Sequence, residues 1–242
     1  MNKRKIIISL ISTCCILFLV LSYQKYQAKK QMIEITTQAN QKTPLTGQFV
    51  KTINGVVLNT SFKSNIGGEF QSKPLRYACH LDSVIGKDKQ SGNIYIEGNQ
   101  RYLNLNHKWA KAKMINMSPN DYKRPLQILN NKDFKPSIKY SIDAYNDING
   151  KITLNKSQRQ ELLKSMQRDE INNQFDQTSF KNTQLTKVVV GEVIDSKTKL
   201  VHHIEETIDV STKLINYRIT LNLNNLNYQP HVNVINKPAW IK

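Results

Sequence analysis

The feature that most constrains the fold is a strict alternation of apolar and polar residues over nine positions, from Ile215 to Leu223. Successive side chains of a β-strand point to opposite faces of a sheet, so this alternation predicts a long strand with one buried and one solvated face. Further strands are expected at residues 56–59, 75–82, 188–194, 201–210 and 231–235. An antiparallel sheet with one wet face is therefore the expected framework.

A β-hairpin is expected between Asn93 and Leu105. Ile94 and Ile96 share one face, residues 97–100 form a turn, and Leu103 and Leu105 return on one face. The strand pattern thus continues through the middle of the chain.

Trp109 follows this hairpin directly and is flanked by Lys108 and Lys111. A tryptophan between lysines at a sheet margin suits a membrane interface or the mouth of an apolar pocket. A tryptophan that closes one end of the core is the alternative.

Three helical segments accompany the strands. Residues 23–43 predict a polar stalk helix that ends before Pro44. Ser118 and Pro119 suit a helix start, and Ser157 with Gln160 fits a capping box. The last of these helices carries an apolar stripe of Leu162, Leu163 and Met166, which is typical of a helix lying on a sheet. The fold class is therefore α+β.

The N-terminal segment resembles an export signal or a membrane anchor. Three basic residues, Lys3 to Lys5, precede an uncharged run at residues 6–23. This run is marginal for the hydrocarbon core of a bilayer, so an uncleaved anchor and a signal cleaved after Ser22 are both open. We expect a basic head (1–5), a transmembrane or signal segment (6–23), a stalk helix (24–45) and an extracytoplasmic domain (46–242), with secretion if the signal is cleaved.

The exported part is strongly basic. Removing residues 1–22 takes away three basic and no acidic residues, which lowers the net charge from +17 to +14. Such a charge favours contact with an anionic membrane or an anionic cell-wall polymer. The basic residues are scattered and follow no nucleic-acid-binding motif, so nucleic acid is not an expected partner.

The sequence predicts no catalytic residues, metal site or cofactor. His202, His203, Glu205 and Glu206 form the best metal-like cluster, but alternation along a strand directs them to two faces. Cys79 is the only cysteine after the N-terminal segment and is expected to be a buried apolar residue. A nucleophile paired with a base is not recognisable, so the protein is expected not to be an enzyme.

Residues 93–103, the pair Lys108-Trp109 and residues 233–238 resemble the hairpin, the tryptophan motif and the closing strand of exported LolA/LppX-like proteins. The resemblance extends in pattern over residues 29–242. It implies a strongly bent antiparallel sheet, a half-barrel covered by short helices, whose apolar interior holds lipid acyl chains.

By this resemblance, the ligand cavity would be lined by Ile215, Tyr217, Ile219, Leu221, Leu103, Leu105 and Trp109. The expected function is a membrane-tethered extracytoplasmic binding protein for a lipid-like or apolar ligand at the cell surface. The alternative is a structural or assembly protein that docks on an anionic wall polymer or on a protein partner. Sequence does not distinguish a hollow interior from one filled by side chains.

Overall fold

The computed structural model of the protein describes residues 3–105, 108–112, 121–145, 147–172, 182–229, 235–236 and 238, with side chains described from residue 20 of the first helix and up to residue 167 of the last. The strands are β1 (Thr46–Val57), β2 (Thr60–Ser72), β3 (Leu75–Ile85), β4 (Asp88–Glu97), β5 (Gln100–Leu105), β6 (Lys108–Lys111), β7 (Lys139–Ile142), β8 (Ile148–Thr153), β9 (Gln184–Asp195), β10 (Leu200–Ser211) and β11 (Ile215–Asn227). In these residues the helices are α1 (Lys3–Asn40), α2 (Lys123–Asn130) and α3 (Lys156–Asn172), with a 3-10 turn at Lys135–Ser137.

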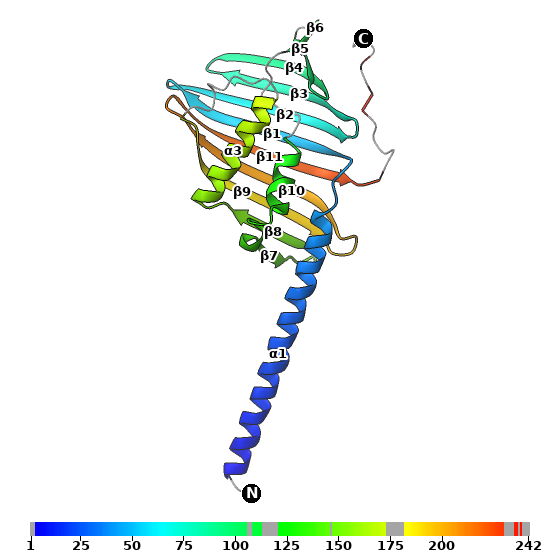
Figure 1. The fold of residues 1–242 in the computed structure, drawn as a ribbon, viewed down its shortest axis with the longest axis vertical. Coiled ribbons are helices and arrows are strands. Elements are labelled where there is room, and N and C mark those ends of the chain that lie inside the picture. Colours follow the sequence, from blue (N-terminus) through cyan, green and yellow to red (C-terminus); the bar gives the residue numbers. More distant parts are fainter. Residues whose placement is uncertain are drawn as a thin grey trace.

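All eleven strands belong to one antiparallel sheet (Figure 1), in the order β6-β5-β4-β3-β2-β1-β11-β10-β9-β8-β7. The chain starts in the middle of the sheet, builds β1 to β6 outward to one edge, and then returns from the other edge. The first and last strands pair at the centre, where Phe49 lies opposite Leu223. The pairing of β1 with β11 therefore joins the half of the sheet built by β1 to β6 to the half built by β7 to β11.

The helices α2 and α3 lie on the same face of the sheet (Figure 1), and both contact β9. We call this the inner face and the opposite one the outer face. Directly paired residues of neighbouring strands share a face, so Phe49, Leu223 and Ile204 all point inward. The side chains between them along each strand point outward. The predicted α+β class, a bent antiparallel sheet covered by helices, is confirmed.

The predicted strands at residues 188–194, 201–210 and 215–223 are confirmed as parts of β9, β10 and β11. The predicted hairpin at residues 93–105 is also confirmed, as β4 and β5, with Gly98 at a φ of 56° in its turn. The predicted strand at residues 231–235 lies outside the described residues except for residue 235. The predicted helix start at Ser118 and Pro119 also lies outside them.

The start of α3 differs from the prediction by two residues. The capping box consists of Asn155 and Gln158 rather than Ser157 and Gln160: the backbone N–H of Gln158 donates to Asn155 Oδ1 at 3.0 Å, and the backbone N–H of Asn155 donates to Gln158 Oε1 at 2.9 Å. Asparagine caps a helix as well as serine does, so both sites satisfied the pattern. The apolar stripe does pack inward, with Leu162 buried.

The helix α1 projects away from the sheet (Figure 1) and only its end, near Ala39, is buried against the core. It includes most of the predicted stalk. Among the described residues, we find no helix with the length and apolar character needed to cross a membrane.

Gly68 on β2 allows an unusually close approach of β3. A Cβ at Gly68 would lie 2.2 Å from the carbonyl oxygen of Ala78 and 2.6 Å from Cα of Cys79. We therefore expect Gly68→Ala to lower the free energy of unfolding by about 1 to 3 kcal/mol in urea denaturation, because the strands must move apart. The matched control is Gly67→Ala, whose Cβ would meet its nearest atom at 3.9 Å. Equal stability of the two variants would contradict this close packing.

Candidate functional site

The inner face of the sheet and the helices enclose one apolar layer. Phe49 of β1 and Ile204 of β10 contribute to it from the sheet, and Leu129 of α2, Leu162 of α3 and Ala39 of α1 from the helices. Each of these side chains is at most 8% exposed. The alternation predicted from the sequence thus supplies one side of this layer, and the short helices supply the other.

Aromatic rings fill the layer beside the start of α2. The ring of Tyr122 stacks on Phe70 with the centroids 4.9 Å apart, and Tyr77 meets Phe49 edge to face at 5.5 Å. Such pairs add to the stabilisation that burial provides. This part of the layer is occupied by the protein's own side chains.

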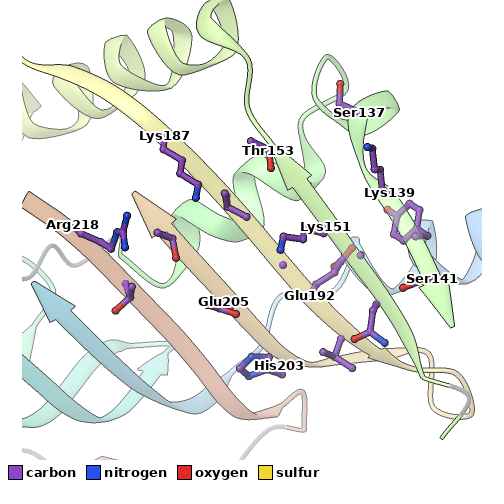
Figure 2. Close-up of a pocket in the computed structure, with 18 residues that line it drawn as sticks. Ser137, Lys139, Ser141, Lys151, Thr153, Lys187, Glu192, His203, Glu205 and Arg218 are labelled. Atoms are coloured by element: carbon purple, nitrogen blue, oxygen red, sulfur yellow. The ribbon is translucent and has the colours of Figure 1, made fainter. Parts of the chain in front are cut away.

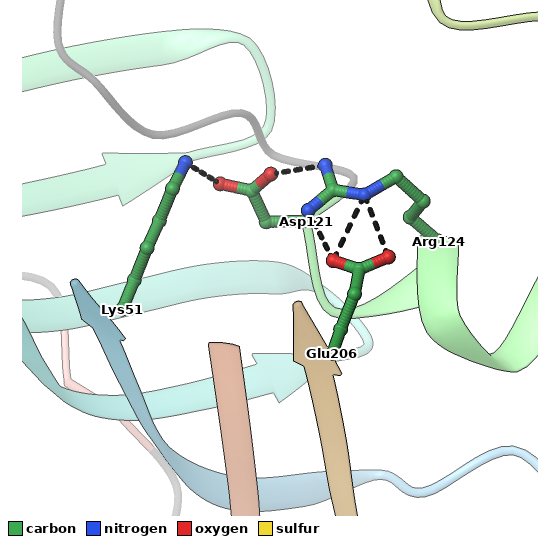
Figure 3. A network of polar contacts seen from close by, with 4 residues as sticks. All are labelled: Lys51, Asp121, Arg124 and Glu206. Atoms are coloured by element: carbon green, nitrogen blue, oxygen red, sulfur yellow. Dashed lines mark hydrogen bonds and ion pairs between the residues drawn. The ribbon is translucent and has the colours of Figure 1, made fainter. Parts of the chain in front are cut away.

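A buried network of four charged side chains ties α2 to the sheet (Figure 3). Lys51 Nζ of β1 donates to Asp121 Oδ2 at 2.7 Å, and Arg124 Nη1 donates to Asp121 Oδ1 at 2.8 Å. Arg124 also forms a two-pronged ion pair with Glu206 of β10, in which Nε lies 3.0 Å from Oε1. Two positive and two negative charges therefore balance inside the layer.

Electrostatics hold Arg124 in its charged form. Burial acts to lower the pKa of Arg124, but the carboxylates of Glu206 and Asp121 outweigh it and raise the pKa. A planar guanidinium that bonds to two carboxylates has a defined position and orientation. The network therefore sets where α2 begins above the sheet.

A second buried polar group lies where α1 meets the sheet. Asn40 Nδ2, at the end of α1, donates to Glu192 Oε1 of β9 at 3.1 Å. Burial raises the pKa of Glu192 to about 7, although Asn40 and the more distant charge of Lys135 act to lower it. Among the described residues, Glu192 Oε2 and Asn40 Oδ1 find no hydrogen-bond partner. This carboxyl is thus poised to change its charge near neutral pH.

The cover over the inner face thins toward one end of the sheet. Along β11, Leu223 and Leu221 are at most 1% exposed, whereas Ile215 at the start of the strand is only partly buried. Along β3, exposure rises from 1% at Tyr77 to 56% at Ile85. In both strands the exposure of the inward side chains increases toward the same end of the sheet, where the turns at Ile215 and Ile85 are neighbours.

These turns define what we call the hairpin end: residues 58–59 between β1 and β2, 86–87 between β3 and β4, and 212–214 between β10 and β11. The register places them together, since Val57 is paired with both Thr60 and Ile215, and Phe62 with Ile85. The partly covered inner face therefore opens at the hairpin end.

Large apolar side chains are exposed at the hairpin end. Leu58 is 76% exposed and Leu214 is 68% exposed, in addition to Ile85. Lys87 and Lys213 belong to the same turns and are exposed as well. These two leucines and one isoleucine at adjacent turns, together with the two lysines, form an amphipathic edge suited to an apolar surface with an anionic rim.

The outer face carries a trough of about 890 Å³ over β7 to β11. Figure 2 shows the side chains of these strands around it, with Lys151, Lys187, His203 and Arg218 among those labelled. The lining residues are Ser137, Lys139, Tyr140, Ser141, Asn149, Gly150, Lys151, Thr153, Lys187, Val189, Gly191, Glu192, Val193, His203, Glu205, Thr207, Arg218 and Thr220. The trough is polar and mainly cationic, in contrast to the inner face.

No family model and no curated protein matches this sequence. Several solved structures match most of this chain at low identity. Lipoprotein LppX of Mycobacterium tuberculosis is 12% identical with a TM-score of 0.42, over 84% of this chain and 96% of that one. LprF from Mycobacterium bovis is 10% identical with a TM-score of 0.45, over 86% and 97%. A LolA superfamily protein from Nitrosomonas europaea is 7% identical with a TM-score of 0.28, over 82% and 94%.

At 12% identity or less, none of them identifies a ligand for this chain.

Six of the seven predicted cavity residues share the inner face. Ile215, Tyr217, Ile219 and Leu221 follow one another along the inner side of β11, and Leu103 packs against the same core. Leu105 lies beside Gly92 on the inner side of the β4–β5 pair.

Trp109 lies on the outer face, where it packs with Tyr95, Tyr102 and Ile235. Its register explains this position, because Trp109 is paired with Asn104 rather than with Leu103 or Leu105.

The charged residues of the inner face were not predicted as a site. A signal for them exists in the sequence, because Lys51 stands between the inward positions of Phe49 and Ile53, and Glu192 between those of Val190 and Ile194. A charge at an inward position of an alternating strand indicates a buried polar partner.

Proposed function

We propose that the protein is a membrane-tethered, extracytoplasmic, non-enzymatic binding protein for a lipid-like ligand. The observation that supports this proposal is the inner face that loses its cover toward the hairpin end and finishes among Leu58, Ile85 and Leu214. An apolar surface that is partly exposed to water gains free energy, about 25 cal/mol per Å², when an apolar ligand covers it.

An amphiphile would lie with its acyl chain against the inner face and its head group at the hairpin end. Ile215, Tyr217 and Ile219 offer apolar side chains that are only partly buried. Lys87 and Lys213 offer positive charge at the opening. An anionic head group next to these lysines is favoured by about 1 kcal/mol for each lysine. The ligand class is therefore an anionic or zwitterionic lipid.

The tether would be the uncharged run at residues 6–23, with three basic residues before it. The basic head resembles the inner side of an export signal, so the sheet would lie outside the cytoplasm. The long α1 would then hold the sheet away from the membrane surface.

Mass spectrometry of lipid extracted from purified residues 29–242 tests the proposal. This fragment keeps all eleven strands and the end of α1. We expect a bound amphiphile, and we expect Ile215→Glu to weaken the binding of a fluorescent fatty acid at least about tenfold, because a charge would face the acyl chain.

The matched control for this test is Asn216→Glu, which places the same charge on the outer side of the same strand. Recovery of the fragment without lipid, together with equal fatty-acid binding by both variants, would refute the carrier function.

A further inference from the structure

The outer trough is a second candidate site, separate from the apolar layer because it lies on the other face of the sheet. It spans five neighbouring strands, β7 to β11, and has a volume of about 890 Å³ (Figure 2). The proposed lipid site needs only the inner face. A ligand of the trough therefore does not depend on the proposed function.

The register gives the trough a smooth polar floor. Thr153, Val189, Thr207 and Thr220 are paired in series from β8 to β11, which places three hydroxyl groups in one row. In the next row, Gly191 lies between Lys151 and Glu205. The floor is lowest at Gly191, because a Cβ there would meet a single atom within 4 Å, the Gly150 carbonyl oxygen at 3.8 Å.

Cationic side chains border this floor on two sides. Lys139 and Lys151 come from the edge strands β7 and β8, and Lys187 comes from β9; all three are exposed. None of the three forms an ion pair with another described residue. Arg218 is held in place by Asp209, with Nε 2.6 Å from Oδ1.

Negative charge in the lining is limited. Glu205 is the exposed carboxylate of the lining, whereas the side chain of Glu192 is buried and lies on the inner face. Three lysines without ion pairs face one exposed carboxylate, so the trough has a net positive potential. Such a potential attracts anions and concentrates them at the surface.

The spacing of the charges favours an extended ligand. Lys151 on β8 and Arg218 on β11 are three strands apart, which corresponds to about 14 Å at the usual strand spacing. A single small anion cannot contact both sides. A chain with charges several ångströms apart can contact both while its hydroxyl groups reach the threonine row.

We propose that the outer trough binds an anionic polymer of sugars or polyols joined by phosphodiesters, of the kind found in cell walls. Phosphate groups would lie beside Lys139, Lys151 and Lys187, and polyol or sugar hydroxyls would bond to the threonine row. A nucleic acid is a poorer fit, because stacking of bases requires aromatic platforms and Tyr140, the aromatic residue of the lining, packs against the core on the inner face.

Isothermal titration of the full-length protein in detergent with a poly(glycerol phosphate) tests the site. We expect Lys139→Gln/Lys151→Gln/Lys187→Gln to weaken binding at least about tenfold and to reduce its dependence on salt. The matched control, Lys63→Gln/Lys73→Gln/Lys89→Gln, removes the same charge from exposed positions outside the trough and should change affinity less than about twofold. Equal losses in both triple variants would refute a defined site.

A second variant tests the shape of the trough without a change in charge. Gly191→Val would fill the floor, and we expect the affinity for the polymer to fall about tenfold, while Gly67→Val, an outer-face glycine on β2 outside the trough, should leave it unchanged. Tighter binding of single-stranded DNA than of the polymer would overturn the ligand class. Absence of polymer binding would overturn the proposal and leave the lipid experiment unaffected.

Discussion

Arg124→Met should lower the free energy of unfolding by about 3 to 5 kcal/mol, measured by urea denaturation at pH 7. The guanidinium of Arg124 satisfies Glu206 and part of Asp121, and Glu206 is fully buried. Methionine fills a similar space but donates no hydrogen bonds, so two carboxylates would stay in the apolar layer with only Lys51 to balance them. The large cost comes from these uncompensated charges rather than from lost packing.

The exposed ion pair of Arg218 with Asp209 is the matched control for this variant. Its geometry is as good, with distances of 2.6 and 2.9 Å, but Arg218 is exposed on the outer face. Arg218→Met should therefore cost no more than about 1 kcal/mol. A comparable loss in the two arginine variants would show that burial is not the cause.

The double variant Arg124→Met/Glu206→Leu separates the cost of an uncompensated buried charge from the contribution of the ion pair itself. Removing both partners eliminates the buried charge of Glu206, so this variant should be more stable than Arg124→Met alone. The same comparison bears on function, because the network positions α2 over the inner face. Loss of lipid binding in Arg124→Met together with its recovery in the double variant would indicate that charge balance, rather than the salt bridge itself, positions the helix.

Local patterns in the sequence were sufficient to predict β3, the β4–β5 hairpin and β9 to β11, whereas the strand expected at residues 56–59 is wrong, because it spans the turn between β1 and β2. The alternation from Ile215 to Leu223 corresponds to β11, since the inward residues at these positions are all apolar. The start of α3 was missed by two residues because Asn155 and Ser157 are equivalent caps in sequence. Strand order depends on the pairing of β1 with β11, which no local pattern encodes.

The candidate site was predictable only in part. The apolar inner residues follow from alternation, but the partner of Lys51 lies just before α2 and that of Glu206 lies on α2, both distant in sequence. Alternation also does not tell which face a residue occupies after a turn, and Trp109 accordingly lies on the outer face. Charges at inward positions indicate that a polar network exists, although they do not identify its members.

Glu192→Gln should stabilise the protein above pH 7 by up to about 3 kcal/mol and remove one component of its pH dependence. Burial raises the pKa of Glu192 from 4.5 to about 7 in the folded protein. Between these two values the folded protein keeps a proton that the unfolded chain has lost. Stability therefore falls as the pH rises through this window and levels off above it.

Glutamine keeps the acceptor for Asn40 Nδ2 and resembles the protonated carboxyl, so the variant should show no loss of stability from this position between pH 4.5 and 7. The control is Glu205→Gln, whose carboxyl is exposed on the outer face of the neighbouring strand. Urea denaturation at several pH values measures both variants. A wild-type slope that persists in Glu192→Gln would place the titrating group elsewhere. Loss of this slope in Glu192→Gln would show that the contact between α1 and the sheet strengthens on mild acidification, because Glu192 meets α1 at the negative end of the helix dipole.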